Sequence, residues 1–421
     1  MGLQVFERGD LPRWARIQRT LFSEEVVDVA GAVAEAFRGA DMGALVRPGA
    51  RVAIGAGSRG IDRYAEVIRA VVAELRGLGA EPFVFPAMGS HGGATAEGQL
   101  EVLRQYGVTE AAVGAPVRAA MDTVLLGHEG DVPVYFDRLA ATGADAIVPV
   151  NRVKPHTDFH GRIESGLMKM IAIGMGKQRG ADIFHARGFD EFPELIPAVA
   201  RFSLSRLPIL AGVALVENGL GRLARIEAVT AARIEEREAE LLESARRWMP
   251  RLPGRQVDVL VIDRIGKDVS GIGSDSNVIN RYYTGRLPQE PSVQRIIVRG
   301  LTEATEGNAS GLGQADVVLR RAVLAFDPEV TYMNCITAKT PEGARIPLTV
   351  DNDRQALHVA LACCVKLTPG RERLLRIEDT KHLDRMWASE AMLDEIAADE
   401  RVELLSPPEP IAFDAAHMLV D

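Results

Sequence analysis

The sequence predicts an α/β protein with two α/β domains, mainly parallel sheets, and an active site in the crevice between the domains. With 421 residues, the chain is too long for one ordinary hydrophobic core. Short apolar runs typical of buried strands alternate with stretches whose apolar residues recur at helical period, and this order favours parallel sheets. The segment RWMPRLPGR (247–255) carries two prolines and a glycine, as a linker does. We therefore expect an N-terminal catalytic and cofactor-binding domain over 1–253 and a smaller C-terminal domain over 254–421, with the tail (407–421) packing back on the first domain.

The elements expected in the first domain follow from the spacing of their apolar residues. The order strand, helix, strand predicts right-handed crossovers between parallel strands. Because ligands bind beyond the carboxyl ends of such strands, we expect the loops at Gly55, Met88 and Asn151 to share a crevice. The expected elements are helices over 24–38, 61–78, 191–202 and 231–248 and strands over 51–55, 82–86, 122–126, 132–136, 145–150 and 209–216.

The second domain repeats this alternation after the linker. A Gly/Ser-rich loop around Gly271, Gly273 and Ser274 follows its first strand. The expected elements are strands over 257–262, 295–298, 317–319 and 372–377 and helices over 328–338, 353–365 and 389–397.

Composition narrows the class of protein. The net charge of -9 is spread without acidic or basic blocks, so no nucleic-acid partner is expected. The N-terminus lacks the pattern of a signal peptide, and no apolar stretch reaches the roughly 18 residues of a membrane span, which predicts a cytoplasmic protein with no membrane partner. Cys335, Cys363 and Cys364 are too few for a disulfide framework and are expected to be reduced core residues. The oligomeric state stays open.

GAGSRG (55–60) lies between a predicted strand and a predicted helix, where a dinucleotide fingerprint would stand. The next strand ends in Pro86 and Ala87, without the acidic residue that would hold a ribose hydroxyl. Arg59 also suits a carboxylate or phosphate, because a guanidinium binds two oxygens at once. The pattern leaves open a tight turn, an anion site and a nicotinamide site.

Histidines mark the loops after two further strands. His91 stands between glycines in AMGSHGGAT, with Thr95 as the expected N-cap of the next helix. In KPHTDFHG, His156 and His160 have the spacing of two metal ligands on a helix, but the neighbouring proline and glycine favour an extended loop. A general acid/base histidine beside a carboxylate is the better interpretation, since imidazole titrates near neutral pH.

The stretch from Asn151 to His185 concentrates most of the chemistry. Lys169 lies in an apolar run, where it is either the exposed lysine of an amphipathic helix or a desolvated amine able to act as nucleophile or cofactor attachment point. The nearby glycines, with Lys177 and Arg179, are expected to bind a phosphate.

Taken together, these residues resemble the nickel-dependent lactate racemases and the related 2-hydroxy-acid racemases and epimerases. The family pattern is a Pro-His, a glycine-rich turn that leads to a lysine, a glycine-rich helix start and a later histidine. GSHGGAT is similar to the family's Gly-Ser/Thr-His loop, and Arg59 stands in the place of its arginine after the first strand. The matching residues of the central stretch are Pro155, His156, Gly166, Lys169, Gly174 and His185.

The resemblance implies an isomerase that carries a nickel pincer nucleotide, a pyridinium mononucleotide whose two sulfur-bearing arms hold nickel. It implies that Lys169 attaches this cofactor through a thioamide and that His185 completes the nickel coordination, as one nitrogen can on a square-planar site with soft donors. It further implies that His91 and His156 exchange the roles of acid and base on opposite faces of the substrate, while a hydride moves to the cofactor and back. Cofactor-synthesis enzymes are the implied partners, besides a small 2-hydroxy acid.

Departures from the family pattern surround the expected substrate position. The spacing between His156 and Lys169 is longer than in the lactate racemases and introduces His160, an alternative acid/base. Gly-Leu-Met precedes Lys169 in place of a Gly-Gly pair, and these changes favour an acid larger or more polar than lactate. Lys267, in the second domain, stands where relatives present a lysine to the substrate carboxylate. The rival hypotheses are an NAD(P)-dependent dehydrogenase that uses GAGSRG, a noncatalytic binding protein and a zinc hydrolase.

Overall fold

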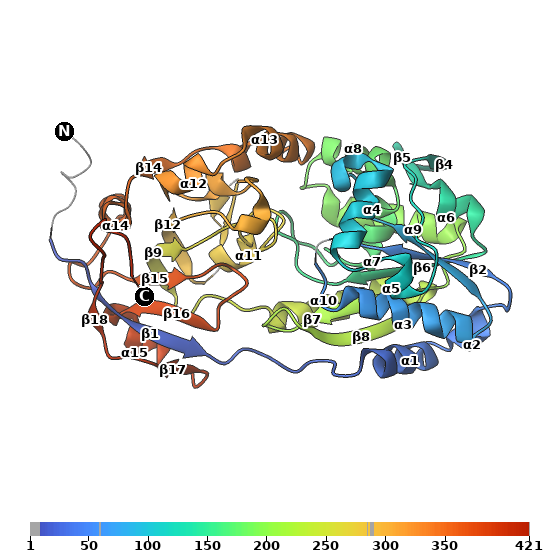
Figure 1. The fold of residues 1–421 in the computed structure, drawn as a ribbon, viewed down its shortest axis with the longest axis horizontal. Coiled ribbons are helices and arrows are strands. Elements are labelled where there is room, and N and C mark those ends of the chain that lie inside the picture. Colours follow the sequence, from blue (N-terminus) through green and yellow to red (C-terminus); the bar gives the residue numbers. More distant parts are fainter. Residues whose placement is uncertain (1–8, 59, 284, 287–289, 421) are drawn as a thin grey trace. The chain divides into compact units, whose positions relative to one another are not determined.

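The computed structural model describes residues 9–58, 60–283, 285–286 and 290–420. The chain divides into two compact units (Figure 1). The central unit is Phe22–Met249, and the terminal unit combines Met1–Leu21 with Pro250–Asp421. The boundary at Met249 lies inside the proline-containing linker segment. An α/β fold with two mainly parallel sheets, as the sequence predicts, is confirmed.

The central unit is built on a five-stranded sheet in the order β3-β2-β6-β7-β8. The strands β3, β2, β6 and β7 are parallel, and β8, which the sequence did not suggest, pairs antiparallel with β7. Two strands expected in this unit form an antiparallel hairpin of their own, β4–β5. The bounds are β2 Arg51–Ala56, β3 Glu81–Pro86, β4 Thr123–Glu129, β5 Val132–Asp137, β6 Ala146–Arg152, β7 Ala211–Glu217 and β8 Leu223–Thr230.

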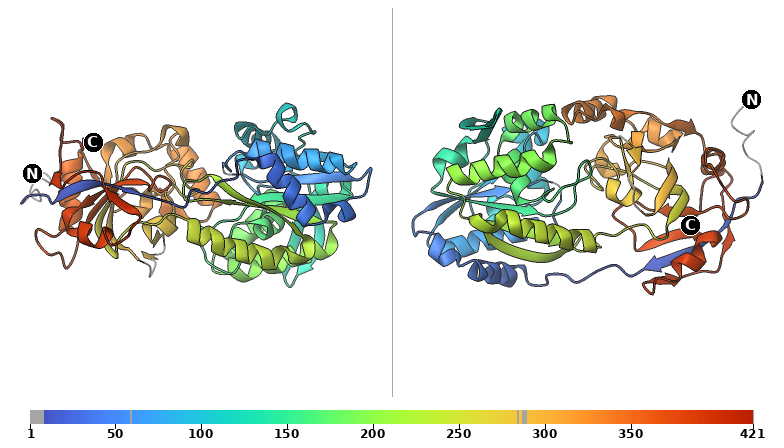
Figure 2. Two further views of the ribbon diagram at one scale, coloured as in Figure 1. Left: turned by 90° about the horizontal axis from the view of Figure 1, so that it is seen from below. Right: turned by 180° about the vertical axis from the view of Figure 1, so that it is seen from behind.

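Helices cover both faces of this sheet (Figure 2), as a parallel sheet requires. Successive residues of one strand enter two different hydrophobic cores, because side chains alternate between the faces. Ile54 and Val148 pack with α1 and α3, whereas Ala53 and Ile147 pack with α7, α9 and α10. The helices are α1 Val29–Gly39, α2 Met42–Leu45, α3 Tyr64–Gly77, α4 Ala96–Gln105, α5 Glu110–Val113, α6 Arg138–Gly143, α7 Leu167–Lys169, α8 Lys177–Arg187, α9 Phe192–Arg206 and α10 Ile234–Trp248.

The first helix begins later than its apolar spacing suggests. Asp28 has an extended backbone, and its side chain accepts a hydrogen bond from Gly31 N at 2.9 Å. A carboxylate in this position caps the first turn and fixes where the helix starts. The expected helix over 24–38 is therefore corrected to Val29–Gly39.

The terminal unit holds a nine-stranded sheet in the order β14-β13-β12-β9-β15-β16-β1-β17, with β18 also paired to β1. Its strands from β14 to β15 are parallel, and the β16, β1, β17 and β18 side is antiparallel. The bounds are β1 Arg13–Arg19, β9 Gln256–Ile262, β12 Ser292–Val298, β13 Val317–Leu319, β14 Leu348–Val350, β15 Leu374–Ile377, β16 Arg385–Ser389, β17 Val402–Leu404 and β18 Glu409–Pro410. A short ladder joins β10 Arg281–Tyr282 to β11 Gly285–Arg286, and the helices are α11 Ser276–Ile279, α12 Arg320–Leu324, α13 Pro328–Thr337, α14 Asp353–Ala362 and α15 Glu390–Ile396.

Both ends of the chain belong to the terminal unit, which corrects two expectations. The N-terminal strand β1 pairs with β16, and its Trp14 and Ile17 are buried, so the segment up to Leu21 does not belong with the first domain. The tail also joins this sheet, through the pairing of β18 with β1, and is assigned to the terminal unit. These pairings join segments far apart in sequence, which local apolar spacing does not reveal.

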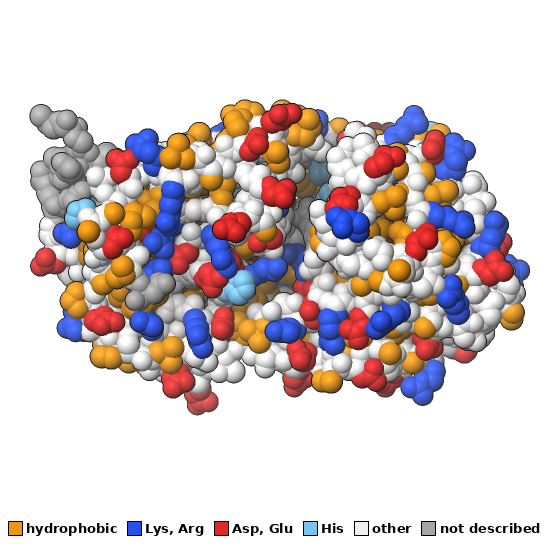
Figure 3. Space-filling view, in the orientation of Figure 1, with side chains coloured by type: hydrophobic (Ala, Val, Ile, Leu, Met, Phe, Trp, Pro, Cys, Tyr) orange, Lys and Arg blue, Asp and Glu red, His pale blue; other side chains and the backbone are white. Residues whose placement is uncertain are grey.

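The three cysteines differ in how deeply they are buried. Cys335 is buried, as expected, but Cys363 and Cys364 are only half-buried because α14 ends at Ala362. Figure 3 shows basic and acidic side chains interspersed over the face in view. Among the described residues, the helices are too short or too polar to cross a bilayer.

Candidate active site

The candidate site lies at the carboxyl ends of three neighbouring strands of the central sheet. β2 pairs with β3 on one side and with β6 on the other. The loop after β3 starts next to the loop after β2, because Ala87 N donates to Ala56 O at 2.7 Å. The loops at Gly55, Met88 and Asn151 therefore begin next to one another, and the crevice that they are expected to share stays a prediction.

The loop after β2 is held on the end of β6. Tyr64 donates its hydroxyl hydrogen to Val150 O at 2.8 Å and accepts a hydrogen bond from Gly57 N at 2.7 Å. A Cβ at Gly57 would lie 2.6 Å from Asn151 Oδ1, so glycine permits this close approach. Arg59 lies outside the described residues, and its expected contact with a carboxylate stays a prediction.

The loop after β3 carries His91 and contacts the loop after β2. Ser58 Oγ lies 2.5 Å from His91 Nδ1, a hydrogen bond that orients the imidazole. Gln99 of α4 donates to Gly89 O at 2.8 Å and to His91 O at 3.3 Å, which fixes the backbone of the loop. Thr95 caps α4 by accepting from Gly98 N at 3.0 Å, as predicted. Ser58 was not predicted as a site residue, although its place in the loop between β2 and α3 was a usable signal.

The loop after β6 is extended around its histidines, as predicted, so His156 and His160 do not share a helix face. Its base is closed by a hydrogen bond from Lys154 N to Ser165 O at 2.9 Å. Inside the loop, the buried Glu164 accepts from His156 N at 2.6 Å and lies 3.1 Å from His160 Nδ1. Arg246 of α10 donates to the same carboxylate. Glu164 was not predicted as a site residue, although a carboxylate a few positions after two histidines was a usable signal.

The electrostatics around Glu164 favour its charged form. Burial by itself raises the pKa of this carboxyl group, but the hydrogen bonds from His160 and His156 N and the Arg246 guanidinium outweigh burial and leave the pKa below its ordinary value. Glu164 therefore places a negative charge inside the loop that carries His156 and His160.

Three predicted site residues border one aromatic cluster, formed by Phe159, Phe189 and Phe192. The His156 ring lies 4.4 Å from the Phe159 ring. The His185 ring lies 5.7 Å from Phe189 and 5.8 Å from Phe192. Lys169 Nζ lies 5.9 Å above the centre of the Phe159 ring. His156, Lys169 and His185 therefore surround the same apolar patch, although they come from a loop and two helices.

Lys169 ends the short helix α7, which a buried carboxylate caps. Leu167 and Met168 are buried, whereas Lys169 is partly exposed. Glu238 of α10 accepts from Met168 N at 2.9 Å at the start of α7. A Cβ at Gly166 would lie 2.4 Å from the Glu238 carboxylate, so the glycine admits this cap. Burial raises the pKa of Glu238 to about 8 despite the backbone hydrogen bonds from Met168 and Leu167 that lower it.

Replacement of Glu238 by glutamine should change how stability depends on pH. Because the pKa of Glu238 rises from 4.5 to about 8 on folding, the folded wild-type protein holds this proton more tightly, and stability falls as pH rises through that window. The slope is at most about 1.4 kcal/mol per pH unit. In Glu238→Gln this fall should disappear in urea unfolding at pH 5, 7 and 9. Glu236→Gln, on the exposed side of α10, is the control and should keep the wild-type slope; the same slope in Glu238→Gln would contradict the raised pKa.

The predicted phosphate-binding role of Lys177 is wrong. Its side chain is fully buried, forms an ion pair with Asp137 at 2.8 Å, and donates to Pro86 O at 2.6 Å and Gln99 Oε1 at 3.2 Å. Burial lowers the pKa of Lys177, although Asp137 acts in the opposite direction. Lys177 thus joins α8 to β3 and α4. Through Gln99, which binds Gly89 O and His91 O, it also helps to fix the backbone of the loop that carries His91. The nearby Gly174 serves close packing, since a Cβ there would lie 2.5 Å from Ala87 O.

Two further predicted residues, Arg179 and Lys267, have other recorded contacts. Arg179 is exposed, with its guanidinium 4.2 Å from the centre of the Tyr135 ring, and its role toward a phosphate stays a prediction. Lys267 belongs to the terminal unit, where its Nζ donates to Gly271 O and to Asn334 Oδ1, both at 2.5 Å. Its contact with a substrate carboxylate stays a prediction.

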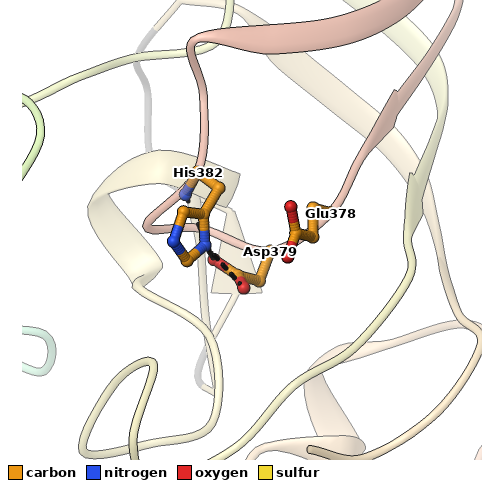
Figure 4. Close-up of side chains that lie close together, drawn as sticks. All are labelled: Glu378, Asp379 and His382. Atoms are coloured by element: carbon orange, nitrogen blue, oxygen red, sulfur yellow. Dashed lines mark hydrogen bonds and ion pairs between the residues drawn. The ribbon is translucent and has the colours of Figure 1, made fainter.

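The terminal unit also contains a group of side chains with metal-ligand chemistry, Glu378, Asp379 and His382 (Figure 4). Their ligand atoms lie within 4.8 Å of one another, and His382 Nδ1 is 2.8 Å from Asp379 Oδ1. Arg264 pairs with both carboxylates, however, and supplies a positive charge where a cation would bind. We assign this group no function.

Among solved structures, the chain is similar to the lactate racemase apoprotein from Thermoanaerobacterium thermosaccharolyticum. The two share 11% sequence identity with a TM-score of 0.47, over 87% of this chain and 85% of that chain. No family model matches the sequence, and the curated proteins contain no match either. A functional assignment therefore depends on the residues of this chain and on their arrangement.

Proposed function

We propose that this protein is an isomerase, a racemase or epimerase that inverts the hydroxyl-bearing carbon of a 2-hydroxy acid. The observation that carries the proposal is the convergence of Lys169, His156 and His185 on one aromatic cluster. The His91–Ser58 pair lies at the same carboxyl edge of the sheet, where α/β proteins bind ligands. The imidazoles of His91 and His156 suit proton transfer. The amine of Lys169 and the imidazole of His185 suit the attachment of a cofactor.

The residues fit the nickel pincer nucleotide that the sequence resemblance implies. Lys169 has a partly exposed amine at the end of α7 and would attach the group, and the His185 imidazole would complete the nickel coordination. Phe159 and Phe192 of the aromatic cluster are buried, and the half-buried Phe189 would offer an apolar surface to a flat ring. When bound, this group would supply an acceptor and donor of hydride. Of the basic residues predicted for its phosphate, Arg179 is accessible and Lys177 is not.

The chain's own residues would then bind the acid and move its hydroxyl proton. His91, oriented by Ser58, and the histidines of the 153–166 loop would act as acid and base. Arg59 would pair with the substrate carboxylate, as a guanidinium group does. The residues around the loop differ from those of the lactate racemases, so we propose a substrate larger than lactate, such as a sugar acid.

The decisive experiment uses protein coexpressed with enzymes that make the cofactor. Single enantiomers of 2-hydroxy acids, from lactate and malate through aromatic acids to sugar acids, are assayed for optical inversion without added nicotinamide. Inversion of at least one acid, with nickel found by elemental analysis, is the expected result. Net oxidation that requires added NAD(P) would instead favour a dehydrogenase. If the protein contains zinc and hydrolyses a substrate, a hydrolase would be favoured. If it contains no nickel and converts none of the acids, a noncatalytic binding protein would be favoured.

A further inference from the structure

We propose that Glu164 is a positioning residue that orients His160, and that His160, not His156, accepts the hydroxyl proton of the substrate. The first part concerns the geometry of the loop by itself. The second part depends on the proposed function. Both follow from the hydrogen bonds that the buried carboxylate and the two imidazoles form.

Glu164 is the centre of the loop that carries the two histidines. Its side chain is fully buried, and its carboxylate accepts from His156 N at 2.6 Å and from Gly161 N at 3.2 Å and lies 3.1 Å from His160 Nδ1. Arg246 donates to this carboxylate and, at 2.9 Å, to Gly161 O, and it also pairs with Glu243. Removing the carboxylate would leave buried donors on both sides of the loop without their acceptor, which is costly.

The carboxylate determines which nitrogen of His160 carries the proton. An ionised carboxylate only accepts hydrogen bonds, so His160 Nδ1 must be the donor. A neutral imidazole has one donor and one acceptor nitrogen, which leaves Nε2 of His160 as the acceptor. The His160 side chain is 35% exposed, so its ring is partly accessible to solvent. A carboxylate at the far nitrogen also stabilises the imidazolium that forms when Nε2 takes a proton.

His156 differs from His160 in what contacts its Nδ1. Asp158 N donates to His156 Nδ1 at 3.0 Å, closer than the Asp158 carboxylate, which lies 3.6 Å away, so Nδ1 is an acceptor and the neutral ring carries its proton on Nε2. The His156 side chain is only 9% exposed and packs against Phe159. Neutral His156 therefore suits a hydrogen-bond donor to the substrate, and neutral His160 suits a base.

In the proposed step, the substrate loses one proton and one hydride. In the oxidising direction the substrate O–H bond would break and an N–H bond would form at His160 Nε2, and the hydrogen on carbon would leave as hydride, for which the proposed nucleotide would supply the acceptor. The products are a planar 2-keto acid and a His160 imidazolium whose Nδ1–H faces the Glu164 carboxylate. The reverse transfer restores the neutral ring.

The tautomer can be measured without cofactor or substrate. Long-range ¹⁵N–¹H spectra of imidazole-labelled apoprotein, at a pH where the rings are neutral, should show His160 as Nδ1–H and His156 as Nε2–H. In Glu164→Gln the His160 signals should move toward a mixture of both tautomers, whereas Glu243→Gln, which removes the other carboxylate partner of Arg246, should leave them unchanged. An Nε2–H tautomer for wild-type His160 would overturn the positioning role, and this measurement requires no variant to fold.

Kinetics of the cofactor-loaded protein test the second part. Glutamine keeps a donor but is no base, so His160→Gln should lower kcat by about 10²- to 10⁴-fold, and His156→Gln by less than about 10-fold. Glu164→Gln should lower kcat by about 10- to 100-fold with KM within about 2-fold. A larger loss in His156→Gln than in His160→Gln would overturn the assignment of the base. If wild-type protein inverts no acid, the proposed function fails and the assignment of the base with it, while the tautomers still decide the role of Glu164.

Discussion

Replacement of Lys169 by alanine is expected to reduce inversion to background. The amine is proposed as the attachment point of the nucleotide, and it lies 5.9 Å from the centre of the Phe159 ring in the aromatic cluster. A noncovalent group would be lost on purification, so the expected loss is larger than for any acid/base residue. Mass spectrometry of digested, coexpressed wild-type protein should show the added mass on the Lys169 peptide, and Lys169→Ala should lack the added mass.

Lys169→Arg is the matched variant for this prediction. Arginine keeps a cation near the Phe159 ring but cannot form a thioamide, so this variant should also be inactive. Both variants should unfold in urea close to wild type, because Lys169 is partly exposed. An unmodified Lys169 peptide in active wild-type protein would refute the attachment.

Replacement of His91 by alanine is expected to lower kcat by about 10²- to 10⁴-fold, the usual contribution of a general acid or base. The imidazole lies at the carboxyl edge of the sheet and is oriented by Ser58 Oγ at 2.5 Å. Ser58→Ala, which removes only the orienting contact, should cause a smaller loss, about 10-fold or more. Steady-state inversion rates over a range of substrate concentrations separate kcat from KM.

Nickel content distinguishes the acid/base histidine from the metal ligand. His91→Ala should keep its nickel, because this residue is proposed to act on the substrate, whereas His185→Ala should lose much of it. His128→Ala is the control, since His128 is exposed on the β4–β5 hairpin. Full activity in His91→Ala would remove this residue from the proposed reaction.

Most elements of the fold were predictable because their signal is local. The apolar spacing around β2, α3 and β3 specifies each element within a few residues, and the positions of these elements agree with the expectation. The extended loop around His156 and the cap at Thr95 were also predictable, since proline, glycine and threonine act on the backbone next to them. Several strands were not predicted, among them β1 and β8, because they are defined by partners distant in sequence or by antiparallel pairing at an edge.

The candidate site, like the fold, was only partly predictable from the sequence. The sequence by itself determined the chemical groups in the stretch from Asn151 to His185 and the strand ends from which the loops begin. Only the tertiary structure decided that Lys177 is buried against Asp137, that Ser58 meets His91, and that Glu164 lies beneath His160. The physical reason is that a residue's identity and its local backbone preference are properties of neighbouring positions. Burial, pKa and hydrogen-bond partners depend on side chains that the folded chain brings together from distant positions.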